Sequence, residues 1–223
     1  MQENDIENIQ AKRSQSRYLQ ILPGFIHNIN SPLMNISGRV ELIELKYPEI
    51  GSASEILRQL DRVNNNIDSL RYVIELERSD SQNEINLASF FLNFHKFLLF
   101  HVKYKHHLQC EYDISDGLSI KTSPRYLVDI FYEICLHCIE NAKQGSQILI
   151  KGYQEDDSTI VEIQRVGNPF SETEISLIND NANTSFDVPE VVGLMLVKYY
   201  LNKLKGSLTL KQTEDMQQYT VVF

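Results

Sequence analysis

One histidine, His27, combines nucleophilic chemistry with an exposed position on a predicted helix. Apolar residues recur around it at alternating spacings of four and three, the heptad pattern of a helix in a bundle. With Leu22 at a d position and Ile26 at an a position, His27 falls at b and faces away from the seam. Ser31 lies one turn further along the same face. Neutral imidazole is nucleophilic near pH 7, so His27 could accept a phosphoryl group; the alternative is an ordinary surface histidine.

Two long helices are expected to hold this histidine in place. Pro32, inside the first, should bend it near His27 because proline removes a backbone hydrogen bond. A turn with Pro and Gly follows at residues 47–52. Two helices bury such a seam poorly, whereas two hairpins close a four-helix core, so the pattern predicts a homodimer. The seam residues are Leu22, Ile26, Ile29, Leu33, Ile36, Val40 and Ile43, then Ile56, Leu60, Val63, Ile67, Leu70 and Ile74.

The composition turns polar near residues 79–83, where we place a boundary between a hairpin domain at 1–80 and a second domain at 81–223. The second domain mixes helical and strand patterns, so the fold class is α+β with α/β layers following the hairpin. Ser123 should cap a strong helix that begins at Pro124. Helices are expected at 87–104, 124–142, 171–179 and 190–204, and strands at 108–113, 118–121, 148–153, 159–164, 207–211 and 219–223.

Charge and composition exclude several classes of function. The net charge of −9 argues against nucleic acid and against an anionic membrane surface. No run approaches the roughly 20 apolar residues of a membrane span, and the polar N-terminus is unlike a signal peptide, so we expect a cytoplasmic protein. Three cysteines suit a reducing compartment; Cys135 and Cys138 lie on a predicted helix without a second pair, as core residues rather than zinc ligands.

The segment 25–33 resembles the H-box of two-component sensor histidine kinases, in which a phosphoacceptor histidine is followed by an acidic residue and, later, Pro-Leu. His27, Pro32 and Leu33 match this pattern, and Ser31 stands where Thr or Asn is usual. Asn28 replaces the acidic residue, which the family uses to activate the histidine for attack on ATP. The resemblance implies that His27, Asn28 and Ser31 form the catalytic segment.

The second domain resembles the kinase catalytic domain, a Bergerat-type α/β sandwich, and the likeness extends from about residue 15 to the C-terminus. Asn141 matches the N-box asparagine that binds the Mg²⁺ of ATP, and Gly167 matches the glycine of Asp-x-Gly. Gly193 matches the second glycine of Gly-x-Gly-Leu. By resemblance, Asn141, Gly167 and Gly193 would bind ATP, with Asn141 as the metal ligand. Gly193 could instead serve helix packing, and Asn141 could instead be an ordinary helix-end residue.

Departures from the family motifs argue against nucleotide binding. Arg165 replaces the aspartate that accepts a hydrogen bond from the adenine amino group, and arginine has no acceptor. Val191 replaces the first lid glycine, where the backbone normally approaches phosphate closely. The loop at 179–189 is short for an ATP lid. Together these losses predict weak or absent binding of ATP and Mg²⁺.

Three functions remain open on this evidence. The first is a histidine phosphotransferase that passes a phosphoryl group between His27 and the aspartates of response-regulator receiver domains, with a separate sensor kinase supplying the pathway. The second is an ATP-dependent histidine autokinase with a divergent nucleotide site. The third is a pseudokinase-like docking module without chemistry at His27.

Overall fold

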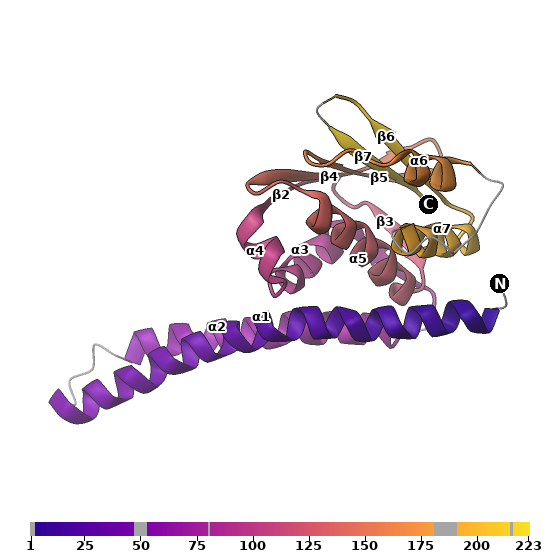
Figure 1. Cartoon of the computed structure of the whole chain (residues 1–223). Helices are drawn as coiled ribbons and strands as arrows, with labels where there is room; N and C mark the ends of the chain where they lie inside the picture. Colours follow the sequence, from indigo (N-terminus) through magenta and orange to yellow (C-terminus); the bar gives the residue numbers. More distant parts are fainter. Residues whose placement is uncertain (1–2, 47–52, 80, 181–190, 215) are drawn as a thin grey trace.

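The computed structural model describes residues 3–46, 53–79, 81–180, 191–214 and 216–223. Figure 1 shows a layered α+β architecture: a mixed sheet, a layer of helices beneath it, and a long helical hairpin against the other side of those helices. The predicted α+β class is confirmed. The turn expected at 47–52 and nearly all of the loop expected at 179–189 lie outside the described residues.

The hairpin consists of α1 (Glu3–Lys46) and α2 (Ala53–Glu77), which pack side by side. At 1.5 Å per residue, the 44 residues of α1 span about 66 Å. The helix begins well before the heptad seam that predicted it. It continues through Pro23 and Pro32, and in Figure 1 it follows a gentle arc rather than a sharp kink.

The apolar seam of the hairpin is only half covered within one chain. Ile29, Ile36 and Ile43 of α1 are half-buried. The other seam residues of α1, and two seam residues of α2, are exposed to solvent. Some apolar residues beside the seam are exposed as well. Exposed apolar side chains on the hairpin are Leu19, Leu22, Ile26, Leu33, Met34, Val40, Leu42, Leu60 and Ile67. An unpaired apolar stripe of this length is typical of a surface that binds another protein.

The main sheet has five strands in the order β2-β4-β5-β7-β6. β2 runs parallel to β4, and the remaining neighbours are antiparallel. Strand β1 pairs with β3 in a two-stranded ribbon. The sequence predicted β3 but not β1, because β1 contains only one apolar residue, Ile85. The predicted strands otherwise agree with the structure to within a few residues. The bounds are β1 Asn83–Asn86, β2 Leu108–Ile114, β3 Ser119–Thr122, β4 Ser146–Glu155, β5 Ser158–Arg165, β6 Ser207–Gln212 and β7 Gln217–Val222.

The single helix expected at 87–104 is wrong: it is two helices, α3 (Leu87–Leu98) and α4 (Val102–His107). His101 begins the second with extended backbone and a ring nitrogen that accepts the Tyr104 N–H at 3.5 Å. The turn lets Phe100 and Tyr104 both enter the core. Neither Gly nor Pro marks it, so tertiary packing outweighed local helical preference.

Helix α5 (Pro124–Asn141) is the central element of the helical layer, with α3 and α7 (Val192–Lys203) beside it; α6 (Glu172–Asn179) lies near β6. The predicted start at Pro124 is confirmed, although the Ser123 hydroxyl donates to the Ser79 carbonyl instead of capping the helix. Phenylalanines of α3 pack on α5, with Phe91 and Phe131 ring centroids 4.7 Å apart. Cys135 and Cys138 are buried and unbridged, as expected.

Candidate functional site

His27 lies in a groove between the hairpin and the turn from α3 to α4. The side chain is exposed, and with Asn28 and Ser31 it lines a hollow of about 440 Å³. The predicted catalytic segment is therefore gathered at one place. The other lining residues come from α2, from α3, from α4 and from the turn between α3 and α4: they are Arg62, Asn65, Asn66, Ser69, Lys96, Leu99, Phe100 and Lys105. We call this hollow the His27 groove.

Asn28 joins three elements at the floor of the His27 groove. Its side-chain oxygen accepts a hydrogen bond from Lys105 Nζ at 2.8 Å, and its backbone carbonyl accepts from Asn66 Nδ2 at 3.0 Å. An amide that accepts from a lysine cannot take a proton from His27. In this chain, Asn28 instead holds the ammonium of Lys105, which lines the same groove as His27.

Gly24, which the sequence reasoning missed, brings α1 against the second domain. A Cβ atom at this position would lie 1.7 Å from the carbonyl oxygen of Phe100, so no larger residue fits without separating the two segments. The ring of Phe25 packs edge-on against Phe100 with centroids 5.2 Å apart. The Pro23-Gly24 pair inside a helical pattern was the available signal, since a helical glycine often marks close backbone approach.

The region where a nucleotide would bind is built around the end of α5. Four polar residues of α5, Asp129, Glu133, His137 and Asn141, recur at intervals of four and therefore lie along one side of this largely buried helix. Asn141 Nδ2 donates to the His137 carbonyl at 3.0 Å. This contact is the ordinary end of a helix rather than a preformed metal site. Among the described residues, no group of three or more His, Cys, Asp or Glu side chains could hold a metal ion.

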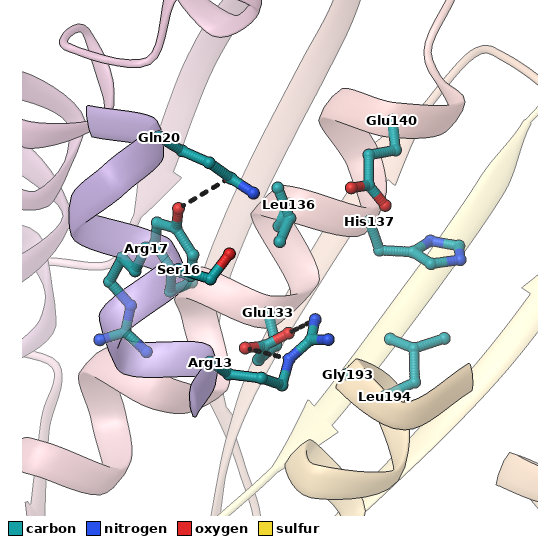
Figure 2. A pocket seen from close by; sticks show the side chains of 11 residues that line it. Arg13, Ser16, Arg17, Gln20, Glu133, Leu136, His137, Glu140, Gly193 and Leu194 are labelled. Atoms are coloured by element: carbon teal, nitrogen blue, oxygen red, sulfur yellow. Dashed lines mark hydrogen bonds and ion pairs between the residues drawn. The ribbon is translucent and has the colours of Figure 1, made fainter. Parts of the chain in front are cut away.

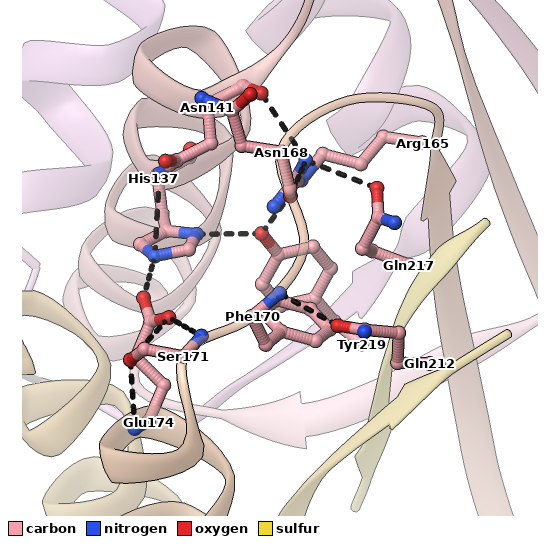
Figure 3. A network of polar contacts seen from close by, with 10 residues as sticks. All are labelled: His137, Asn141, Arg165, Asn168, Phe170, Ser171, Glu174, Gln212, Gln217 and Tyr219. Atoms are coloured by element: carbon pink, nitrogen blue, oxygen red, sulfur yellow. Dashed lines mark hydrogen bonds and ion pairs between the residues drawn. The ribbon is translucent and has the colours of Figure 1, made fainter. Parts of the chain in front are cut away.

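Arg165 is fully buried in this region and is held by several acceptors (Figure 3). Its Nε donates to Tyr219 Oη at 3.1 Å, and Nη1 donates to the carbonyl of Asn168 at 3.0 Å and to Gln217 Oε1 at 3.2 Å. The guanidinium also lies 5.4 Å from the ring centre of Phe170. Arg165, which stands where the resemblance expects an aspartate, thus organises a network of the protein's own groups, and only its Nη2 has no hydrogen-bond partner among the described residues.

His137 extends the same network to α6. Its Nδ1 lies 2.6 Å from Tyr219 Oη, and its Nε2 donates to Glu174 Oε1 at 2.5 Å (Figure 3). Burial tends to raise the pKa of Glu174, but hydrogen bonds from His137 and from the Ser171 backbone outweigh it and hold the pKa at about 2. Glu174 and Ser171 also form a capping box at the start of α6.

Gly167 and Gly193 are explained by packing. A Cβ at Gly167 would lie 2.4 Å from the Asn141 carbonyl oxygen, where the backbone after β5 meets the end of α5. Gly193, at the start of α7, faces an ion pair: a Cβ there would lie 2.6 Å from Glu133 Oε2 and 2.8 Å from Arg13 Nη2. Figure 2 shows Arg13 of α1 reaching over Glu133 toward Gly193.

The N-terminal half of α1 is fixed to α5 by buried charges that the sequence reasoning missed. Arg13 Nε donates to Glu133 Oε1 at 2.8 Å (Figure 2), and Arg17 Nη2 pairs with Asp129 at 2.6 Å. Arg17 also pairs with Glu77 of α2, and its guanidinium lies 4.4 Å from the ring centre of Tyr132. We call these pairs of Arg13 and Arg17 the α1 latch. Its signal was the pair of carboxylates in the apolar pattern of α5.

Beside Gly193 the structure has a hollow of about 240 Å³ lined by Arg13, Glu133 and His137, but side chains also stand where adenine and phosphate are expected. The adenine side is filled by Arg165, Phe170 and Tyr219, which are almost fully buried. At the start of α7, where phosphate would approach the lid glycine, Arg13 and Glu133 occupy the space in front of Gly193. A nucleotide would have to displace both networks, and each displacement would leave buried polar groups unpaired at about 1–3 kcal/mol apiece.

Comparisons with known proteins define the fold. No protein-family model and no curated protein sequence matches the chain. Among solved structures, the Acinetobacter baumannii histidine kinase AdeS matches with a TM-score of 0.52 and 16% identity over 88% of this chain and 96% of that chain. The catalytic domain of histidine kinase ThkA gives 0.55 and 15% over 64% and 95%. A bacterial phosphotransferase gives 0.51 and 10% over 93% and 96%.

The chain therefore has the fold of the histidine kinases, a helical hairpin followed by an ATPase-type α/β unit. The fold expected from the H-box and N-box resemblances is confirmed. Within the described residues, every helix is too short or too polar to cross a membrane.

Proposed function

We propose that this protein is a histidine phosphotransferase of a phosphorelay, in which His27 accepts a phosphoryl group from one response-regulator aspartate and passes it to another. One observation carries the proposal: His27 is exposed in a groove, whereas Arg165 is buried where adenine is expected and the hollow of about 240 Å³ beside Gly193 is lined by the paired Arg13 and Glu133. An acceptor histidine needs access by a partner protein, whereas an autokinase also needs an open nucleotide site.

The proposed reaction is a simple displacement at phosphorus. A ring nitrogen of His27 attacks the phosphorus of an aspartyl phosphate, a P–N bond forms, the P–O bond to the aspartate breaks, and the aspartate leaves as a carboxylate. The reverse step delivers the group to a second receiver. Positioning and charge stabilisation provide most of the catalysis in phosphoryl transfer, so little further machinery is required.

We also propose that two chains associate through their hairpins. Val40 of α1 and Leu60 and Ile67 of α2 are exposed along the unpaired stripe, and two such stripes would form the core of a four-helix bundle. Residues 1–80 would then be the dimerisation and phosphotransfer domain, and residues 81–223 the degenerate ATPase-type domain. The partners would be receiver domains and a separate sensor kinase, in the cytosol, where the three free cysteines stay reduced.

The test is phosphoryl transfer to His27 from receiver domains and, separately, from ATP. A panel of receiver domains, phosphorylated with radiolabelled acetyl phosphate, is mixed with wild type and with His27→Ala, and separate samples receive labelled Mg·ATP. We expect label on wild type from at least one receiver, none on His27→Ala, and none from ATP. Label from ATP would favour the autokinase, for which Asn141, Gly167 and Gly193 remain in place. No label from any source would leave only the docking module.

A further inference from the structure

The His27 groove concentrates positive charge in an acidic protein. Arg62 of α2, Lys96 of α3 and Lys105 of α4 all line it, and none of the described lining residues carries a carboxylate. The whole chain has a net charge of −9. The local charge around the exposed histidine is therefore opposite in sign to the net charge of the chain, and it attracts anions to the groove.

Two of the three cations, Lys105 and Arg62, are held by hydrogen bonds. Lys105 Nζ donates to Asn28 Oδ1 at 2.8 Å, which holds the ammonium beside the residue that follows His27. Arg62 Nη1 is 3.3 Å from Gln59 Oε1 on the same helix. The ammonium of Lys105 keeps donors for a further acceptor because an amine cation has three.

The walls that carry Lys96 and Lys105 are fixed against α1. Phe100 lies between these lysines in sequence, and its carbonyl approaches Gly24 so closely that a Cβ atom would not fit. Its ring packs against Phe25, two residues before His27. In Figure 1, α3 and α4 lie over the hairpin between the sheet and α1. The second domain is thus positioned to contribute side chains to a reaction on the first.

We propose that Arg62, Lys96 and Lys105 form an anion site that holds the phosphoryl group on His27 and speeds its transfer, so the second domain supplies part of the catalytic site. This inference rests on the phosphotransferase function proposed above. The phosphoryl group on phosphohistidine carries negative charge on three oxygens. Charge-assisted hydrogen bonds from lysine and arginine stabilise that charge as the P–N bond forms or breaks.

The experiment uses phosphoramidate as a partner-free phosphoryl donor, so that docking of a receiver does not affect the result. His27 attacks its phosphorus, a new P–N bond forms, the donor P–N bond breaks, and ammonia leaves. Rates are measured by phosphate-affinity gels on full-length wild type, Lys105→Ala, Lys96→Ala and Arg62→Ala. Lys103→Ala is the matched control, because Lys103 is an exposed lysine of the same helix that does not line the groove. His27→Ala defines the background.

We expect the double variant that combines Lys105→Ala with Lys96→Ala to label His27 about tenfold or more slowly than wild type, while Lys103→Ala stays within about twofold of wild type. Lys105→Arg should recover part of the rate because it keeps the charge. Raising NaCl from about 50 to 500 mM should slow wild type more than the double variant, since salt screens exposed charges. Thermal unfolding of each variant checks that the fold is kept.

The outcomes separate this inference from the function beneath it. If wild type takes label from phosphoramidate or from receivers but the groove variants match Lys103→Ala, the anion site is wrong and the phosphotransferase stands. If wild type takes no label on His27 from any donor, the phosphotransferase itself fails, and the anion site fails with it.

Discussion

Arg165 Nε and the phenol oxygen of Tyr219 lie 3.1 Å apart in the interior, where the histidine-kinase resemblance places an aspartate and a nucleotide. Both side chains are almost completely buried. Burial raises the pKa of Tyr219 well above its usual value, so the phenol stays neutral and can accept from the arginine. Arg165, at the position where the resemblance expects an acceptor for adenine, is a structural centre of the domain.

Arg165→Met should therefore destabilise the protein rather than open a nucleotide site. It removes hydrogen bonds to Tyr219, Asn168 and Gln217 and leaves their buried acceptors unpaired. We expect a loss of about 2–4 kcal/mol in the free energy of unfolding, measured with urea. Arg71→Met, at an exposed arginine of α2, should change it by less than about 0.5 kcal/mol. Equal effects from the two substitutions would contradict the structural role.

The α1 latch should contribute to stability through buried charge. Arg17 is 2% exposed and pairs with Asp129 and Glu77. Arg17→Met leaves Asp129 in the interior without its cation, and removing one partner of a buried pair costs about 3–5 kcal/mol. Arg39→Met breaks an exposed pair with Glu55 and should cost at most about 1 kcal/mol. Chemical denaturation of both variants measures the difference; a small loss for Arg17→Met would mean that α1 is not held there.

Two glycines in α1 should respond in opposite directions to alanine. Gly24→Ala places a methyl group against the Phe100 carbonyl, so we expect it to destabilise the protein and to slow labelling of His27. Gly38 has no atom within 4 Å of an added Cβ, and Gly38→Ala should stabilise the helix by about 0.5–1 kcal/mol. Thermal melts and phosphoramidate labelling test both. Wild-type behaviour of Gly24→Ala would show that α1 and the α3–α4 turn are not in contact.

The hydrogen bonds of Glu174 predict a defined pH dependence. Its folded pKa of about 2 lies below the ordinary value of 4.5, so its stabilisation is present above pH 4.5 and is lost as the pH falls toward 2. Glu174→Gln should lower the free energy of unfolding by about 1 kcal/mol at pH 7, because solvent screens this partly exposed carboxylate. The difference in free energy of unfolding between wild type and Glu174→Gln should stay constant between pH 8 and 5 and become smaller at lower pH. A gap that widens in acid would contradict the assignment.

The exposed hairpin stripe predicts the oligomeric state. Wild type should have a mass in solution of twice the 25.9 kDa of one chain. Val40→Asp puts a charge in the proposed bundle core, where an unpaired carboxylate is strongly unfavourable, and should give a monomer. Light scattering measures both masses. A monomeric wild type would refute the four-helix bundle, and Glu41→Gln serves as a neighbouring control at an exposed polar position.

Local sequence patterns predicted most elements of this fold because the heptads and alternating strands are written over short windows. The pattern failed where distant residues decide the structure. The helix ends at Leu98, and the turn that follows places Phe100 against Gly24 of α1. Strand β1 is stabilised by its pairing with β3. Likewise His27, Asn28 and Ser31 could be found together from their spacing on one helix. Lys105 could not, since only the fold brings it to Asn28 across 77 positions.

The α1 latch also has a consequence for how the chain folds during synthesis. Arg13 emerges from the ribosome 120 residues before its partner Glu133. At roughly 5–20 residues per second, α1 waits about 6–24 s for the helix to which it binds. During that interval its apolar stripe is open and Arg13 lacks Glu133, although Arg17 can already pair with Glu77 of α2. The proposed pairing of two hairpins on one messenger would then precede the folding of the domain that later packs beside the His27 groove.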